Sequence, residues 1–234
     1  MAECRDVGPR ITDKMIEKIC SIDGVKDSVI DLVSLVWSDL KLRPGLWLGS
    51  EADSPEDIEY FKKLGAVYTT EEDLMIWQYQ TIIWPCKNGA VHKNFRSGAL
   101  TVTEGRNIEE GDHFKAVICD WLAEENDLSV GDTITVETKE GVFQESKEPL
   151  KTWGEPVDLE IVGIFHANFS QKPSDFTPED GYIENVIYAD MDTYEKLEEN
   201  MDLVVDSSAY QASAKPYQQS GSEKAVAVNV IGNC

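Results

Sequence analysis

The sequence predicts an α+β fold with two lobes, in which a β-rich lobe is inserted into a split βαβ lobe. Three observations lead to this prediction. A helix pattern at the N-terminus runs directly into a strand pattern, and residues 100–183 are rich in short strands and turns. A strand followed by a helix then resumes near residue 184. We therefore assign residues 1–99 and 184–234 to an α/β lobe, and residues 100–183 to the inserted lobe.

The first expected element is a helix that Thr12 can cap. Its apolar residues recur at helical spacing and fall on one face: Met15, Ile16, Ile19 and Ile22. Gly24 supplies the C-terminal stop. Residues 25–37 are rich in β-branched side chains and partly alternating, so they predict one strand. A helix followed by a strand suits one half of a split βαβ layer.

A second helix is predicted over residues 54–64. Ser54 is a good N-cap, and Pro55 is tolerated in the first turn because its missing N–H has no helical partner there. Gly65 ends the pattern. Residues 40–50, which precede this helix, contain Pro and Gly and predict a loop.

The β-rich lobe is expected to contain short strands and one helix. Residues 116–119 form an apolar strand, after which Asp120 can cap a helix over residues 121–126. The Gly-Asp pair at 131–132 turns the chain into an alternating strand over residues 133–137. The turn chemistry of Asp predicts that its carboxylate accepts backbone N–H bonds.

The remaining elements follow the same rules. A hairpin tip is expected at residues 140–141, a buried strand over 158–165 and a polar loop over 166–181. A strand over 184–188 and a helix over 193–200 complete the main pattern. Two further features are expected near the C-terminal end: a capping box formed by Asp192 and Glu195, and a strand over residues 225–231.

The charge of the chain limits its partners. The 234 residues carry a formal net charge of −23, with a pI near 4.4, which argues against binding to nucleic acid or to anionic lipid. No apolar run is long enough for a transmembrane helix, and the N-terminus lacks a signal-peptide pattern. We expect neither feature in this segment.

The five cysteines do not identify a metal or redox motif, because no two of them have C-x-x-C spacing. Cys20 and Cys119 lie in apolar patterns, so we expect both to be small core residues. The sequence leaves the disulfide state and the redox compartment open.

The common catalytic and phosphate-binding motifs are absent from the sequence. The chain has no P-loop, no G-x-S-x-G elbow and no H-E-x-x-H helix. Asp112 and His113 are adjacent, but a metal site needs three or four converging ligands. We therefore expect no catalytic residue, no cofactor and no metal, and ascribe a structural role to Arg106, which can bond a nearby carboxylate or carbonyl.

The best interaction candidates are apolar residues in loop-like contexts: Trp47, Leu48, Trp77 and Trp84. Tryptophan is favoured as an interface anchor, and six tryptophans are present. The competing explanation is that these side chains fill the core between the lobes, since large aromatic residues are mostly buried. Sequence alone leaves both explanations open.

An ordered set of short motifs resembles a known family. The set comprises F-x-x-G at 95–98, E-G-R-x-I at 104–108, L-A-E-x-N at 122–126, L-x-V-G-D at 128–132, V-G-I-F at 162–165 and E-N-x-I-Y at 184–188. In this order they resemble the extracytoplasmic core domain of FtsX-like ABC-transporter permeases, the MacB-type domain. The resemblance covers about residues 10–35 and 92–200, and it fails after Asp202, where residues 206–223 are rich in Ser, Ala and Gln.

The resemblance implies a porter-like split βαβ lobe and a function that is not enzymatic. The implied partners are the transmembrane helices of the permease, a separate cytosolic ATPase, a possible second copy of the domain, and a peptide or protein substrate. The implied location is the extracytoplasmic face of the bacterial cell membrane. The alternatives are a free-standing secreted domain that binds a peptide or glycan and, more remotely, a metal-assisted hydrolase.

Overall fold

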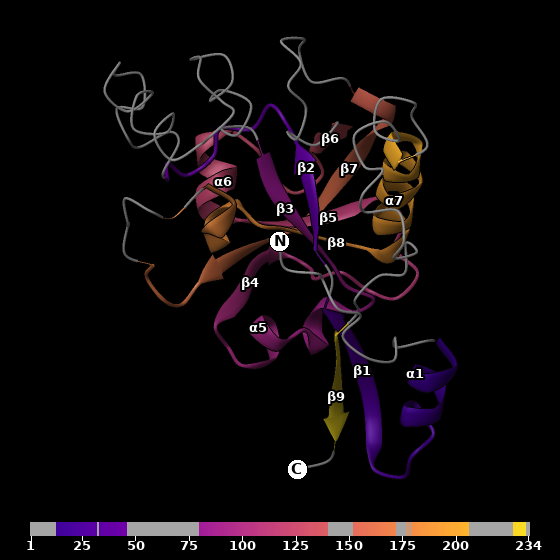
Figure 1. Ribbon diagram of the computed structural model, residues 1–234. Coiled ribbons are helices and arrows are strands. Elements are labelled where there is room, and N and C mark those ends of the chain that lie inside the picture. Colours follow the sequence, from indigo (N-terminus) through magenta and orange to yellow (C-terminus); the bar gives the residue numbers. More distant parts are fainter. Residues whose placement is uncertain are drawn as a thin grey trace, which may run out of the picture.

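The structure, a computed structural model, describes residues 13–31, 33–45, 80–139, 152–171, 177, 179–205 and 227–232. Its main feature is a closed barrel of six strands (Figure 1). The ring consists of β2 (Ser34–Trp37), β3 (Gln80–Pro85), β5 (Lys115–Cys119), β6 (Thr133–Lys139), β7 (Thr152–Ala167) and β8 (Ile187–Ala189). The strand order is β7-β5-β8-β3-β2-β6, and the pairing of β6 with β7 closes the ring. A seventh strand, β4 (Leu100–Gly105), pairs with β7 outside the ring.

Alternation along the strands fills the barrel interior with apolar side chains. On β6, Ile134 and Val136 are buried, whereas the alternate residues Thr133 and Thr135 are exposed. The buried set continues around the ring through cross-strand pairs: Ile134 with Leu159, Val136 with Val157, Ile83 with Ile187, and Ala116 with Ala189. Closure of the ring leaves no unpaired strand edge within it, which is how barrels avoid exposing backbone groups.

The long strand β7 organises the barrel because it pairs with three other strands. One edge pairs with β5 in parallel; the other pairs with β6 and then with β4, both antiparallel. After β4, the chain crosses β7 at Gly163, where an added Cβ would lie 2.0 Å from the Arg106 carbonyl oxygen. The Arg106 N–H donates to the Val162 carbonyl at 2.9 Å. The glycine of the V-G-I-F motif therefore permits a close backbone crossing.

The Gly-Asp turn lies between α6 (Asp120–Glu125) and β6, as the sequence predicted. Gly131 has a φ of +99°, which glycine adopts without strain. The Asp132 carboxylate accepts the Ser129 N–H at 2.8 Å, so its predicted structural role is confirmed. The predicted cap of α6 needs a correction: Asp120 is the first helical residue, and its carboxylate accepts the Trp121 N–H.

The helix α7 (Met191–Val205) packs along β7. Its cap is Asp190, which accepts hydrogen bonds from the backbone N–H and the hydroxyl of Thr193, both at 3.0 Å. The predicted capping box of Asp192 and Glu195 is therefore wrong, because the helix begins earlier than expected. Farther along α7, the Asn200 amide donates to the Glu155 carbonyl of β7 at 3.0 Å.

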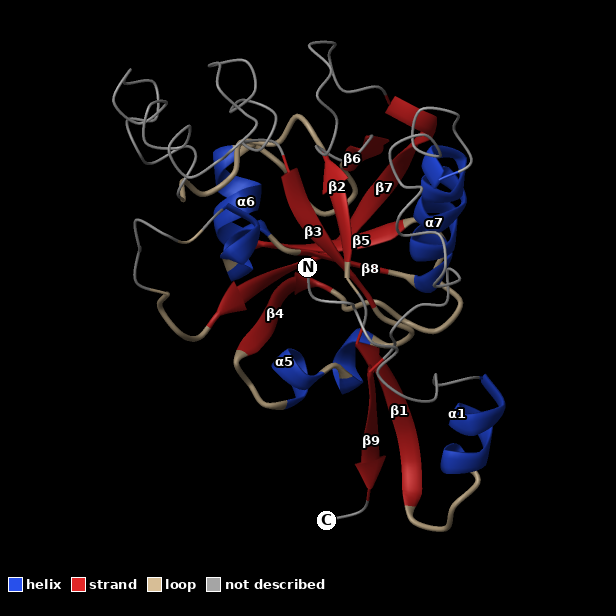
Figure 2. Cartoon of the chain, in the orientation of Figure 1, coloured by secondary structure: helices blue, strands red, loops and turns tan. Residues whose placement is uncertain are grey.

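A small unit stands apart from the barrel. The strands β1 (Val25–Asp31) and β9 (Ala227–Gly232) form an antiparallel two-stranded ribbon, with α1 (Asp13–Cys20) beside it. Figures 1 and 2 show the ribbon projecting below the barrel, on the side where β4 also lies. We call α1, β1 and β9 the ribbon unit.

The predicted two-lobed α+β fold, with a porter-like split βαβ lobe, is wrong. Strands from the first ninety residues and from 187–189 close one barrel with strands from 100–183, so the molecule is mostly β. The reason is that pairing joins distant segments: β3 pairs with β8 in parallel across about a hundred residues of chain. Such pairing leaves no trace in local periodicity.

Other sequence expectations have mixed outcomes. The single strand predicted over residues 25–37 is two strands, since β1 belongs to the ribbon and β2 to the barrel. Cys119 is buried as expected, but Cys20 is exposed, so its predicted core position is wrong. The helix predicted over residues 54–64 and the hairpin tip at 140–141 lie outside the described residues.

Candidate interaction surface

One of the four predicted interaction residues, Trp84, can be placed in the fold. Trp47, Leu48 and Trp77 lie outside the described residues. Trp84 lies on β3 and is half-buried, with its ring turned to the outside of the barrel, opposite the interior residue Ile83. Trp84 is therefore neither a fully buried core residue nor a fully exposed surface residue.

Trp84 belongs to a group of rings on the outer face of the sheet. We define the aromatic cluster as Trp84, His92, Phe95, Phe165 and Tyr188. Trp84 and Tyr188 are cross-strand neighbours on β3 and β8, and their rings stack with centroids 5.9 Å apart. His92 meets the Trp84 ring edge-on at 4.9 Å. Edge-to-face and offset-stacked pairs of this kind are favourable beyond the area that they bury.

A short segment after β3 covers the cluster. It consists of η1 (Gly89–Val91), which Asn88 caps, and α5 (Lys93–Arg96). Phe95 on α5 packs edge-on against Tyr188 at 4.9 Å and against Phe165 at 5.8 Å. Gly98 then takes a φ of +76°. The F-x-x-G motif therefore supplies one ring to the cluster and one glycine to the turn into β4.

Within the cluster, Trp84 and Phe95 are half-buried, and the exposed side chain of Lys93 lies over the Trp84 ring. The Lys93 ammonium lies 4.7 Å from the centroid of the Trp84 ring, a cation–π contact. Behind them, the Asn94 amide donates to the Tyr188 hydroxyl at 2.7 Å, which fixes α5 to the sheet. A half-buried tryptophan on a rigid strand, with a cation at its face, has the chemistry of an anchor for a protein partner.

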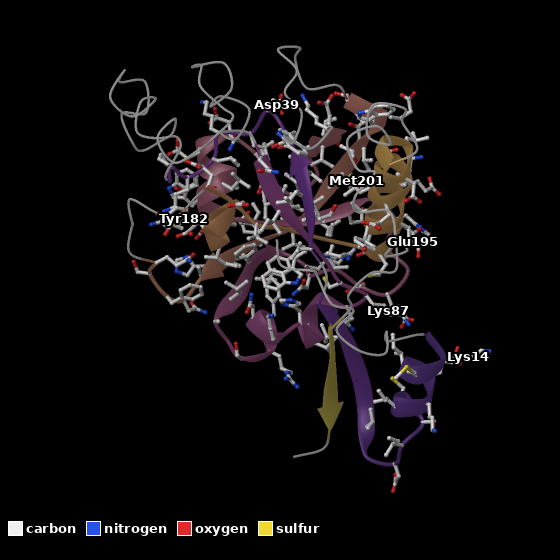
Figure 3. All side chains as sticks on the ribbon, viewed as in Figure 1. Lys14, Asp39, Lys87, Tyr182, Glu195 and Met201 are labelled. Atoms are coloured by element: carbon white, nitrogen blue, oxygen red, sulfur yellow. The ribbon has the colours of Figure 1, made fainter. Side chains whose placement is uncertain are left out.

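A second network holds the chain that leads toward Trp47. The Arg43 guanidinium pairs with the Glu184 carboxylate and lies 4.4 Å from the centroid of the Tyr182 ring, which Figure 3 labels. The Asn185 side chain accepts the Arg43 N–H at 2.6 Å and donates to the Arg43 carbonyl at 3.0 Å. The Gly45 N–H donates to the buried Glu179 carboxylate at 2.8 Å. Glu184 and Asn185 of the E-N-x-I-Y motif thus have a structural role, because they hold the backbone and side chain of Arg43 in place.

Arg106 also has the structural role that the sequence predicted. Its guanidinium makes a bidentate pair with Asp112, with both N–O distances 2.7 Å, and donates to the Asn107 carbonyl. The hydrogen bond from Arg106 is the main reason that the pKa of Asp112 lies below its ordinary value. Neighbouring His113 instead pairs with Asp192 at the start of α7. The Asp112–His113 dipeptide is therefore divided between two different contacts.

Cys119, Asp120 and His166 come together in an arrangement that resembles a catalytic triad. The thiol donates to one Asp120 oxygen at 3.1 Å, and the His166 ring lies 2.6 Å from the other. Burial and the bond to Asp120 raise the pKa of the Cys119 thiol to about 12, and a thiol nucleophile needs the opposite shift. The carboxylate also separates the thiol from the imidazole that would have to accept its proton. The group does not fit nucleophilic catalysis.

Asp120 itself is held in its charged form. Burial would raise the pKa of this carboxyl, but hydrogen bonds from His166, Cys119 and the Trp121 N–H outweigh burial and lower the pKa. The group therefore fixes the start of α6 and the end of β7 to each other.

In the described part of the chain, no three His, Cys, Asp or Glu side chains converge so as to hold a metal ion. None of the helices there is both long and apolar enough to cross a membrane.

No protein-family model matches the chain, and no curated protein matches it. The interaction surface must therefore be interpreted from its own residues.

Sequence reasoning missed several residues that build the surface. Strand alternation could have shown that Ile82 and Trp84 share a face of β3. The partner Tyr188 could not be inferred, because the register of β3 with β8 is not local information. Phe95 carried a weak signal, since it is the first residue of the F-x-x-G motif, and Lys93 lies two residues before it.

Proposed function

We propose that this chain is an extracytoplasmic domain of an ABC-transporter permease subunit, which transmits ATPase-driven motion and contacts a substrate or partner protein. The observation that carries the proposal is the pairing of β1 with β9, the first and last of the described strands. A domain inserted between two membrane helices needs its two connections side by side. The ribbon brings the first and last described strands side by side, with α1 leading into β1, and it projects from the barrel (Figure 1).

The motif residues each have a specific place in the fold. Gly105 has a φ of +66°, and an added Cβ would lie 2.2 Å from the Val162 carbonyl oxygen. Gly163 permits the crossing over β7, and Asp132 closes the turn before β6. The motifs therefore specify crossings and turns of this barrel, whose architecture differs from the porter-like fold that the resemblance implied. The resemblance supports the proposal through the order of the motifs alone.

In this proposal the two regions have different mechanical roles. The barrel is closed and densely buried, so it moves as one body. The ribbon is its connection to the membrane helices, whose motion is driven by ATP hydrolysis on a separate cytosolic subunit. A displacement of those helices reaches the barrel through the ribbon unit, by way of α1 and β1 on one side and β9 on the other, and reorients the surfaces that contact the partner.

The aromatic cluster is the described surface best suited to that contact. Trp84 lies on the barrel strand β3, and Lys93 lies on α5, which the Asn94–Tyr188 hydrogen bond fixes to the barrel, so their orientation follows the motion of the whole body. The partner is a peptide, a protein substrate or a second copy of the domain. Trp47, Leu48 and Trp77 stay candidates for the same role.

Membrane attachment is tested on the natural gene product. The full reading frame is sequenced, and the product is fractionated from its own cells. The proposal expects hydrophobic spans on both sides of this segment, sedimentation with membranes, and cleavage of the domain by protease added outside intact cells. A product recovered free of membranes would instead favour a secreted domain that binds a peptide or glycan, and would overturn the proposal.

Partner contact is tested by substitution in the intact transporter. We expect Lys93→Glu and Trp84→Ala to reduce export or signalling, with a melting temperature near that of the wild type for Lys93→Glu. Phe169→Ala is the matched control, because Phe169 is an exposed aromatic residue outside the cluster. Normal activity of both the Trp84 and the Lys93 variant would exclude this surface as the contact. Ala variants of Trp47 and Trp77 extend the test to the other candidates.

A further inference from the structure

The segment around α5 carries a local charge opposite to that of the chain. Residues 80–103 contain three cations, Lys87, Lys93 and Arg96, and no Asp or Glu. An even spread of the 44 acids over the 234 residues would place about 4 or 5 of them in this segment. The strand β3 accounts for the first six residues, and all three cations follow it. The part of the surface formed by α5 therefore differs in charge from the rest of a strongly acidic molecule.

Two of the cations lie together on the outer side of α5, which Figure 1 shows next to β4. Lys93 and Arg96 are both exposed and are three residues apart, so their side chains leave the same side of the helix. Asn94 and Phe95, which lie between them, instead contact the aromatic cluster through a hydrogen bond and ring packing. The Lys93 ammonium lies over the Trp84 ring. We call Trp84, Lys93 and Arg96 the basic face.

The acids near this segment leave Arg96 available for a contact from outside. Lys87 makes an ion pair with Glu110 at 2.8 Å, so it is not part of the basic face. Glu104, the first acid after the segment, is exposed on β4. In the described part of the chain, no carboxylate makes an ion pair with Arg96. An exposed guanidinium in this state can take a carboxylate as a bidentate partner.

We propose that the basic face binds an acidic segment of a partner protein, with carboxylates at Lys93 and Arg96 and an apolar side chain against the accessible part of the Trp84 ring. The inference rests on the proposed function, because it names the chemistry of the partner at that surface. Arg and Lys supply the charges that a carboxylate pairs with, and a half-buried tryptophan supplies the apolar contact area. Packing on the aromatic cluster holds all three side chains on one platform.

The charge of the rest of the chain makes the basic face selective. A net charge of −23 repels an acidic segment from the molecule as a whole, so attraction is confined to the surface where cations gather. Once the segment is in contact, charges beyond about 8 Å contribute little at physiological salt. A basic segment, in contrast, would find acids to pair with on many parts of the surface. An acidic partner therefore gains one contact and one orientation.

An anionic bilayer fits the basic face less well than an acidic segment does. A bilayer is an extended charged plane, so it would also approach exposed acids outside the face, such as Glu104. A peptide segment is narrow enough to meet the face alone. A second copy of this chain is disfavoured by the mutual repulsion of two acidic molecules.

The test begins with a library of random peptides displayed on phage, which is selected on the immobilised 234-residue chain. We expect the selected peptides to be enriched in Asp and Glu relative to the library. Synthesised with a fluorescent label, they should bind more weakly as the salt concentration rises. A selection without enrichment in acids would overturn the inference.

Paired charge reversals then locate the site. The double variant Lys93→Glu/Arg96→Glu should weaken binding of the selected peptides by about tenfold or more. Lys14→Glu/Lys18→Glu is the matched control, because it makes the same change in net charge at two exposed lysines of α1, and it should change the affinity by less than about twofold. Equal losses in the two double variants would overturn the inference.

Two further measurements separate a loss of charge from damage to the fold. Lys93→Arg/Arg96→Lys keeps both charges and should bind the peptides with an affinity near that of the wild type. Circular dichroism and the melting temperature should be the same for the wild type and all three double variants. Loss of binding in the variant that keeps both charges would reject recognition by charge.

The competing occupants are tested with the same variants. Sedimentation with phosphatidylglycerol vesicles that depends on Lys93 and Arg96 would assign the face to lipid. A dimer in analytical ultracentrifugation that Lys93→Glu/Arg96→Glu dissociates would assign it to a second copy. Either result would overturn the inference.

This test and the test of the proposed function can fail separately. Fractionation of the natural product decides whether the chain belongs to a membrane protein, and the peptide selection decides the chemistry of the basic face. A membrane-bound product whose domain selects no acidic peptides would reject the second proposal alone.

Discussion

The barrel combines parallel and antiparallel strand pairs, whereas the ribbon is one antiparallel pair, and the two regions differ in how their strand edges are satisfied. Each ring strand of the barrel pairs with a neighbour on both sides, and the interior side chains are almost fully buried. In the described residues, β1 and β9 pair only with each other, and a single helix lies beside them. The contrast teaches that rigidity here comes from closure, since an isolated two-stranded ribbon is marginal in water.

The largest expected effect concerns the aromatic cluster on the barrel. Phe165→Ala should lower the free energy of unfolding by about 3–5 kcal/mol, because Phe165 is fully buried and its removal leaves a cavity. Trp84→Ala should cost less, about 1–2 kcal/mol, since part of its ring is already in water. Denaturant unfolding measures both values. Equal losses would show that Trp84 is a core residue, and would remove it from the interaction surface.

The crossing over β7 should be the next most sensitive point. In Gly163→Ala the new Cβ would lie 2.0 Å from a backbone oxygen, so two strands must separate, at a cost of about 3 kcal/mol. Gly89→Ala is the control, because its Cβ would meet the Asn107 side chain, which can turn aside for about 1 kcal/mol. Thermal unfolding of the two variants tests the difference. Similar melting temperatures would mean that β7 and the crossing chain adjust together.

A matched pair of valines tests the comparison of barrel and ribbon directly. Val36 on β2 is fully buried, and Val29 on β1 is 7% exposed. We expect Val36→Ala to lower the free energy of global unfolding by about 2 kcal/mol, and Val29→Ala to leave it almost unchanged. In the second variant, amide hydrogen exchange should become faster in the ribbon alone. A global loss in both variants would show that the ribbon and the barrel unfold as one unit.

The smallest expected effect is a dependence on pH at Asp112. The folded state holds the pKa of this carboxyl below its unfolded value, chiefly through the hydrogen bond from Arg106. Its contribution is therefore fully present above the ordinary carboxyl pKa of about 4 and is lost as the pH falls through the lower folded value. Because the pair is partly solvated, we expect roughly 0.5–1 kcal/mol. Asp112→Asn should reduce the pH dependence of the free energy of unfolding measured from pH 5 to pH 2. An unchanged dependence would show that other groups cause the loss of stability in acid.

The sequence was sufficient wherever the determinants are local. The strand at 116–119, the Gly-Asp turn and the strand that begins at Thr133 were all predicted, because alternation and turn chemistry act within a few residues. The roles of Arg106 and Asp132 were predicted for the same reason. Each of these residues interacts with a partner no more than six positions away.

The sequence failed where distant segments pair. The alternating pattern of residues 25–37 continues through the point where the chain passes from the ribbon to the barrel, so periodicity could not divide it. The start of α7 was misplaced because Asp190 and Asp192 are both good caps, and the buried position of Asp190 decides between them. For the interaction surface, the sequence identified Trp84, but the stacked partner Tyr188 depends on the register of β3 with β8.

The position of β8 within the chain has a consequence for synthesis on the ribosome. This strand joins β3 to β5 around the ring, yet it is the last barrel strand to be made, ending at Ala189. Until it emerges, β3 and β5 each present a strand edge whose backbone groups lack partners. The ring through β7 cannot close during that time. The nascent chain therefore passes most of its translation with exposed strand edges, which is the state in which β-rich chains pair with the wrong neighbour. An early binder such as a chaperone would have its greatest effect in that interval.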